Sequence, residues 1–117
     1  MGGIADQIIS TQLSHCSQRT NPLAIVATRL SLLVQVPEGY AKACSALAQF
    51  DESLDLEALT ADTAIVTGKD DPVSPPKLAE EYARRISSSN YMVLENAGHW
   101  HVFENAEGVA KSLRNFL

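Results

Sequence analysis

TAIVTGKDDPVSPPKLAEEYARRISSSNYMVLENAGHWHVFENAEGVAKSLRNFL, residues 63–117, places two short apolar runs around a more polar segment. The runs AIVTG (64–68) and YMVLE (91–95) predict two buried strands. Ser74 and Pro75 predict a helix start between them, and the apolar spacing after the second run predicts a final helix. The order strand, helix, strand, helix predicts parallel strands, because the crossover helix returns the chain to the same end of the sheet.

A carboxylate and an imidazole follow the two predicted strands. Asp71 comes shortly after the first strand and His99 shortly after the second. The carboxyl ends of parallel strands meet at one edge of a sheet, and neighbouring strands are ~4.8 Å apart. We therefore expect the two side chains to form a hydrogen bond. Such a bond fixes the imidazole tautomer and leaves the other ring nitrogen free to act as a base.

Each of these residues also has a plainer interpretation. Asp71 precedes Pro72, and considered alone an Asp-Pro pair favours an ordinary turn. Asp70 is a competing carboxylate, although the spacing from Gly68 favours Asp71. His99, considered alone, fits an ordinary loop histidine equally well.

Other reactive residues in the sequence give weaker signals. His99 and His101 are two residues apart without a further ligand cluster, so we expect no metal ion and no cofactor. Trp100 fits a substrate-lining aromatic or a packed aromatic equally well. Cys16 and Cys44 fall on the apolar faces of predicted helices, which predicts buried, reduced core residues rather than nucleophiles or a disulfide.

Residues 1–50 predict three amphipathic helices on short connections. The first is marked by apolar residues from Ile4 to Cys16 at helical spacing, the second begins at Asn21-Pro22, and the third begins at Pro37. The chain is thus expected to divide into a helical segment, 1–50, and an α/β segment, 51–117.

Composition excludes several classes of function. The 117 residues are 45% hydrophobic and 20% charged with a net charge of −5, which is typical of one globular domain. The basic residues are scattered, so nucleic acid is not an expected partner. No apolar run is long enough to span a bilayer and no signal peptide is visible, so we expect a cytoplasmic protein without membrane association.

Two motifs of residues 63–117 resemble those of a known family. The chain is similar to the C-terminal portion of α/β-hydrolases, in particular the 3-oxoadipate enol-lactonase and esterase-like members, and residues 1–50 resemble their helical cap. The first motif is G-x-x-D-x-x-x-P and the second is a Gly-His pair followed by an acidic residue and a last helix. They are matched here by Gly68, Asp71, Pro75, Gly98, His99 and Glu104.

The resemblance implies a function in ester or lactone hydrolysis. Asp71 would be the acid and His99 the base of a Ser-His-Asp triad, acting on a small apolar ester or lactone. However, the nucleophile elbow G-x-S-x-G does not occur in the 117 residues. The resemblance therefore implies a truncated hydrolase whose elbow and oxyanion loop would precede residue 1.

Three functions stay open on this basis. The chain could be the acid and base part of a hydrolase, an enzyme that uses Asp71 and His99 as a general base in isomerisation or cyclisation, or a non-catalytic module that binds a small molecule or a partner. The first predicted strand also lacks a neighbour on one side. An open apolar strand edge favours association, so we expect a homodimer or a complementing chain to cover it.

Overall fold

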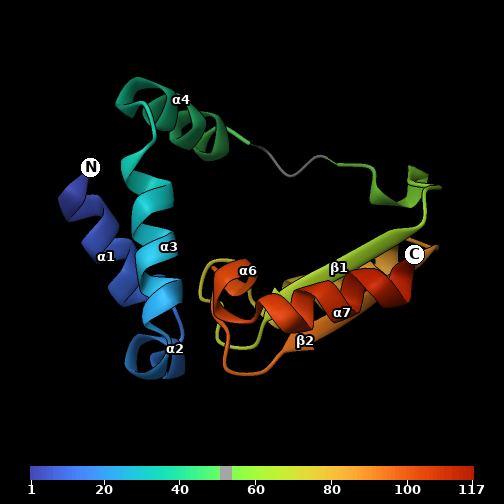
Figure 1. Ribbon diagram of the computed structural model, residues 1–117. Coiled ribbons are helices and arrows are strands. Elements are labelled where there is room, and N and C mark those ends of the chain that lie inside the picture. Colours follow the sequence, from blue (N-terminus) through green and yellow to red (C-terminus); the bar gives the residue numbers. More distant parts are fainter. Residues whose placement is uncertain (51–53) are drawn as a thin grey trace.

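The computed structural model describes residues 1–50 and 54–117, so the predicted segment boundary at residue 51 lies outside the described residues. The fold is helix-rich, with four helices ahead of a two-stranded sheet (Figure 1). The elements in chain order are α1 (Gly2–Gln12), α2 (His15–Thr20), α3 (Pro22–Leu33), α4 (Pro37–Ala48), the 3-10 turn η1 (Leu56–Ala58), β1 (Thr63–Gly68), α5 (Pro76–Arg85), β2 (Ser89–Leu94), α6 (His101–Glu104) and α7 (Ala106–Phe116).

The two strands pair in parallel, as the sequence predicts. The register runs from Thr63 beside Ser89 to Gly68 beside Leu94, so both strands end at the same level. Helices α5 and α7 pack against both strands, and α7 runs along the near side of the sheet in Figure 1. Each strand begins earlier than predicted, at Thr63 instead of residue 64 and at Ser89 instead of residue 91, because Thr63 and Ser89 already pair with each other. Within the described residues β2 is the one strand that neighbours β1.

The N-terminal segment contains four helices where the sequence predicts three. The predicted first helix ends at Gln12, and a second begins after Ser14, whose backbone is extended (φ −60°, ψ 149°). The Ser14 hydroxyl accepts a hydrogen bond from the Ser17 amide at 3.1 Å, which caps α2. The pattern S-x-x-S at residues 14–17 is typical of a helix start. The apolar spacing from Ile4 to Cys16 continues across it, and for that reason one helix was predicted instead of two.

The buried core joins the N-terminal helices to the loop after β2. Two clusters of buried side chains lie among α1 and α3, one around Ile8 and the other around Leu13. Trp100 packs against both clusters, and Phe103 packs against the second. The Trp100 and Phe103 rings stack with centroids 6.0 Å apart. The residues between β2 and α7 are therefore held by the first three helices as well as by the sheet.

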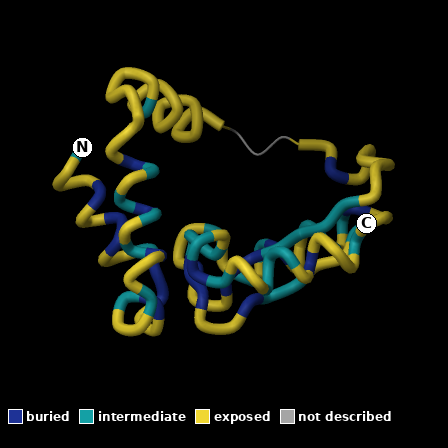
Figure 2. Tube along the Cα trace, in the orientation of Figure 1, coloured by how far each residue is buried: buried dark blue, intermediate teal, exposed yellow. Residues whose placement is uncertain are grey.

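Helix α4 contains no fully buried residue and is exposed over most of its length, as Figure 2 shows; Tyr40 is half-buried and packs against the cluster around Ile8. This overturns the prediction that both cysteines are core residues, because Cys16 and Cys44 are exposed. On the apolar face of α4, Tyr40 at the start of the helix packs against the core, whereas Cys44 and Leu47 further along are exposed. On α2 the buried position is Ser17, and Cys16 lies outside it.

The described chain forms an open arc rather than a sphere. In Figure 1, α1–α3 stand at one end, α4 lies above, and the sheet with α7 forms the other arm. The radius of gyration is 15.4 Å, whereas a compact domain of this length has about 13 Å. Large apolar side chains remain exposed on α3 and α4, including Leu23, Val34 and Leu47. Exposed apolar surface of this kind is typical of a site of contact with another protein segment.

Thr28 gives a test of the N-terminal core. Its side chain is fully buried on α3, and its hydroxyl has no hydrogen-bond partner among the described residues. A buried hydroxyl without a partner costs about 1–3 kcal/mol, and valine has nearly the same shape without that cost. Thr28→Val is therefore expected to raise the free energy of unfolding by about 1 kcal/mol in urea denaturation.

Thr20→Val is the matched control. The Thr20 hydroxyl is exposed and donates to the Cys16 carbonyl at 2.9 Å, so its removal has no buried group to relieve. We expect this variant to be neutral or slightly destabilised. Equal stabilisation of both variants would contradict the burial argument and would indicate an effect on the unfolded chain instead.

Candidate active site

Asp71 is held rigidly in the loop after β1. The residue is 4% exposed, and its Oδ1 accepts hydrogen bonds from the backbone amides of Val73 and Ser74, each at 2.8 Å. The Thr67 hydroxyl at the end of β1 donates to the Ser74 carbonyl at 3.0 Å, which closes the same loop. The carboxylate thus has a fixed orientation before any partner is considered.

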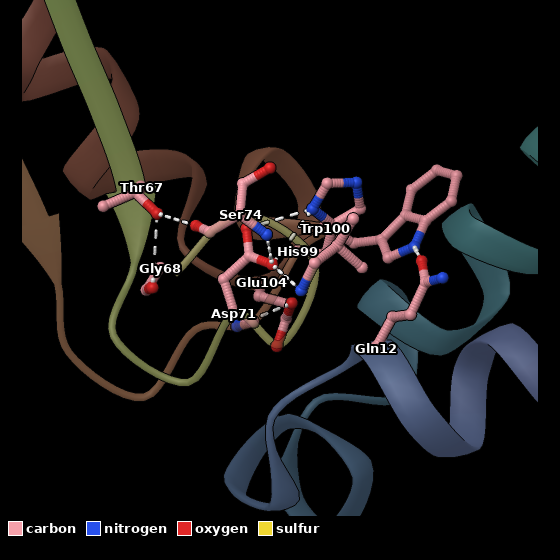
Figure 3. Close-up of polar contacts among 10 residues, drawn as sticks. Gln12, Thr67, Gly68, Asp71, Ser74, His99, Trp100 and Glu104 are labelled. Carbon is pink, nitrogen blue, oxygen red and sulfur yellow. Dashed lines mark hydrogen bonds and ion pairs between the residues drawn. The ribbon is translucent and has the colours of Figure 1, made fainter. Parts of the chain in front are cut away.

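His99, in the loop after β2, faces this carboxylate (Figure 3). Its Nδ1 lies 3.0 Å from Oδ2 and 3.1 Å from Oδ1 of Asp71. When the ring carries its proton on Nδ1, this nitrogen donates to the carboxylate, and Nε2 is left with a free lone pair. The Asp71 side chain is 2% exposed and that of His99 is 35% exposed, so the pair is buried on the acid side and open on the base side.

The alternative interpretations of Asp71 turn out to be compatible. The residue does form the local turn that Asp-Pro favours, through its bonds to the next backbone amides. The same carboxylate also contacts His99, so one group has both roles. Asp70, the competing residue, is exposed.

The loop after β1 and the loop after β2 approach each other closely at Gly68. A Cβ atom on Gly68 would lie 2.3 Å from the carbonyl oxygens of Ala97 and Gly98. The Asp70 amide also donates to the Ala97 carbonyl at 2.9 Å. The backbone of one loop is therefore in direct contact with the backbone of the other, which sets the distance between Asp71 and His99.

An exposed ion pair lies beside these loops. Lys69 follows β1 and Glu95 follows β2, and the Lys69 Nζ donates to both carboxylate oxygens of Glu95 at 2.9 and 2.8 Å. This hydrogen bonding raises the pKa of Lys69 above its ordinary value, so the lysine stays charged at neutral pH. Since both side chains are more than half exposed, the pair adds little stability.

A cavity of about 260 Å³ borders the Asp71–His99 pair. Its walls are mainly apolar side chains of β1 and α5, such as Ile65, Leu78 and Tyr82. The two imidazoles of His99 and His101 stand at its polar end, and the buried Nδ1 of His101 has no hydrogen-bond partner among the described residues. A site of this kind accepts a small, largely apolar molecule.

Trp100 occupies the packed position rather than the cavity wall. Its indole Nε1 donates to Oε1 of Gln12 at 3.1 Å, and its ring packs among the N-terminal helices. It is absent from the residues that line the cavity at Asp71 and His99. A role for Trp100 in substrate binding stays a prediction, and any such role would have to act at a different surface.

Three residues that the sequence does not single out for a structural role contact the His99 loop: Gln12, Ser14 and Glu104. Glu104 stands in the Gly-His motif, but the motif does not predict that its carboxylate is buried. A lone acidic residue in an apolar run, VFEN, was the available signal.

The described residues offer neither a metal site nor a membrane-spanning helix. In residues 1–50 and 54–117, no group of three or more His, Cys, Asp or Glu side chains is arranged to hold a metal ion. None of the helices described combines the length and apolar character needed to cross a membrane.

Comparison with known proteins places this geometry in a family. The family model for the alpha/beta hydrolase fold matches residues 7–106. The pimeloyl-[acyl-carrier protein] methyl ester esterase of Neisseria meningitidis serogroup B is 28% identical over 111 residues, which cover 95% of this chain and 43% of that protein. The proline iminopeptidase PfmaB of Pestalotiopsis fici is 34% identical over 68 residues, 58% of this chain and 24% of that protein.

Solved structures give the same result. A thermophilic esterase from Thermogutta terrifontis superposes with a TM-score of 0.89 at 34% identity, over 98% of this chain and 43% of the esterase chain. The enol-lactonase of Burkholderia xenovorans LB400 superposes with a TM-score of 0.87 at 22% identity, over 99% of this chain and 44% of that one, which supports the fold alone. The chain thus spans less than half the length of these proteins, and it belongs to the alpha/beta hydrolase fold family.

Proposed function

We propose that this chain carries the acid, Asp71, and the base, His99, of an ester or lactone hydrolase site. The observation that carries the proposal is the 3.0 Å contact between His99 Nδ1 and a buried carboxylate, beside an apolar cavity. Such a pair orients an imidazole for proton transfer. The esterase and lactonase names among the similar proteins favour acyl-oxygen substrates.

In this proposal His99 moves one proton twice. A serine hydroxyl attacks the ester or lactone carbonyl while Nε2 of His99 accepts the serine proton, and Asp71 stabilises the resulting imidazolium. His99 then gives the proton to the leaving alkoxide, which departs as an alcohol. Water hydrolyses the acyl-serine by the same route, and the products are a carboxylic acid and the free serine.

The attacking serine belongs, in this proposal, to a polypeptide segment that brings the elbow G-x-S-x-G to the open side of β1. The sequence given contains no such pentapeptide. The same segment would cover the strand edge and the exposed apolar residues of α3 and α4. A complementing chain is favoured over a homodimer, because a second copy would bring no elbow.

A chimera tests this arrangement. The portion of the Thermogutta terrifontis esterase that this chain does not cover is joined ahead of Met1, and hydrolysis of p-nitrophenyl butyrate is measured for the chimera and for the 117-residue chain alone. A fluorophosphonate probe, which labels activated serines, is applied to both proteins. We expect turnover and labelling of the chimera, and neither in the chain alone.

Each other outcome rejects a defined part of the proposal. Labelling of the 117-residue chain alone would show that it has its own nucleophile. A chimera that folds but neither hydrolyses the ester nor reacts with the probe would contradict the catalytic roles of Asp71 and His99. Turnover of a different substrate by the chain alone, lost in His99→Ala, would instead favour the general-base enzyme.

A further inference from the structure

The carboxylate of Glu104 is buried and bridges two distant parts of the backbone. The residue is 9% exposed at the end of α6. Its Oε1 accepts a hydrogen bond from the Gly98 amide at 2.9 Å, and its Oε2 accepts one from the Ser14 amide at 2.8 Å (Figure 3 shows Glu104 below His99). Gly98 immediately precedes His99, while Ser14 is the break between α1 and α2.

The same two backbone segments are in contact at further points. The His99 amide donates to the Gln12 carbonyl at 2.8 Å, and the Ser14 hydroxyl donates to the Asn96 carbonyl at 2.9 Å. A Cβ atom on Gly98 would lie 2.2 Å from the Gln12 oxygen, so the two backbones are as close as atoms allow. The loop that carries His99 therefore rests on the end of α1.

The carboxylate of Glu104 is suited to this position in a way that a neutral side chain is not. Among the described residues no lysine, arginine or histidine forms an ion pair with it, so the backbone amides are the groups that stabilise its charge. Hydrogen bonds to an ionised acceptor are roughly twice as strong as neutral ones. A glutamine accepts at one position only, and its NH₂ group would face the other amide hydrogen.

We propose that Glu104 is a positioning residue for His99: its carboxylate fixes Gly98 to the α1–α2 junction and so holds the imidazole against Asp71. The N-terminal helices thereby determine the orientation of the base. This role depends on the proposed function only in taking His99 as the base, and it is tested without any hydrolysis. It predicts that the Nδ1–H tautomer of His99 depends on a carboxylate that never touches the ring.

The test is Glu104→Gln in the 117-residue chain, with the ring nitrogens of His99 observed by long-range ¹H–¹⁵N NMR. The spectra are recorded at about pH 9, so that the neutral form of the ring is observed and its tautomer is reported directly. We expect the wild type to show the Nδ1–H form, and the variant to shift toward the Nε2–H form that free histidine prefers. Amide exchange at Gly98 and Ser14 is expected to accelerate about tenfold or more.

Glu107→Gln is the matched control, because Glu107 is an exposed acidic residue on α7 and its replacement changes the net charge equally. It is expected to leave the His99 tautomer unchanged. If Glu104→Gln lowers the stability but leaves the tautomer as in the wild type, Glu104 is merely structural and the proposal is wrong. If Glu104→Gln does not fold, Glu104→Asp is used instead, because aspartate keeps the negative charge on a shorter side chain. Faster amide exchange at Gly98 in Glu104→Asp, with the His99 tautomer of the wild type, would also reject the proposal.

Discussion

Replacing His99 by alanine in the chimera is expected to lower kcat/KM for p-nitrophenyl butyrate by about 10⁴-fold, equivalent to ~5.5 kcal/mol of transition-state stabilisation. The reason is that the serine proton then has no acceptor at the site, and the imidazole that Asp71 orients is gone. The loss should appear in kcat rather than in KM. In the proposed mechanism His99 accepts the serine proton in the transition state, while the cavity walls that would bind the ester are unchanged. Initial rates over a range of ester concentrations measure the two constants separately.

His15→Ala is the control for this substitution. His15 is an exposed histidine at the start of α2, so the variant removes an imidazole without touching the site. We expect it to retain wild-type rates. Asp71→Asn tests the acid, since the amide keeps the shape of the loop but no longer selects the Nδ1–H tautomer of His99. We expect it to lower kcat/KM about as much as His99→Ala. A chimera whose rate is unaffected by His99→Ala would require a different base.

Gly68→Ala is expected to destabilise the chain by about 3 kcal/mol or more, and to separate Asp71 from His99. The added methyl carbon would lie 2.3 Å from two carbonyl oxygens of the opposite loop, and both belong to the backbone, so no side-chain rotation relieves the contact. The loop at Ala97 and Gly98 has to move as a whole. Urea denaturation gives the stability change, and the His99 ring signals report the lost contact with Asp71.

Gly3→Ala is the matched glycine control. Its added Cβ meets nothing within 4 Å, and alanine favours the helical conformation by up to ~1 kcal/mol. This variant should be neutral or more stable. If Gly68→Ala unfolded at the same urea concentration as the wild type, the close approach of the two loops would not be a constraint on the fold.

The sequence was sufficient to predict the parallel strands and the meeting of Asp71 and His99. Both follow from rules that hold locally: apolar runs of strand length, turn residues between them, and strands that end at one edge. The spacing from Gly68 also favoured Asp71 over Asp70, and Asp71 is the residue that contacts His99. These features arise within one strand–helix–strand unit, residues 63–99.

The features that could not be predicted depend on contacts between distant residues. The break between α1 and α2 is stabilised by the Glu104 carboxylate, which periodicity within residues 4–16 cannot reveal. Helix α6 lies between the second strand and the final helix, where no helix was predicted, and Phe103 and Trp100 there pack on the N-terminal helices. Cys44 was expected to be buried because its helix has an apolar face, yet among the described residues only Tyr40 of that face packs against the core, and Cys44 is exposed.

The bond from Ser14 to Glu104 joins residues 90 positions apart. During synthesis, this bond can therefore form only after Glu104 has left the ribosome. Contacts of such long range are also the slowest to form, since a long loop of chain must close before they stabilise anything. A polypeptide that stops before Glu104 would lack both hydrogen bonds of its carboxylate, so the loop that carries His99 would lose this link to the α1–α2 junction.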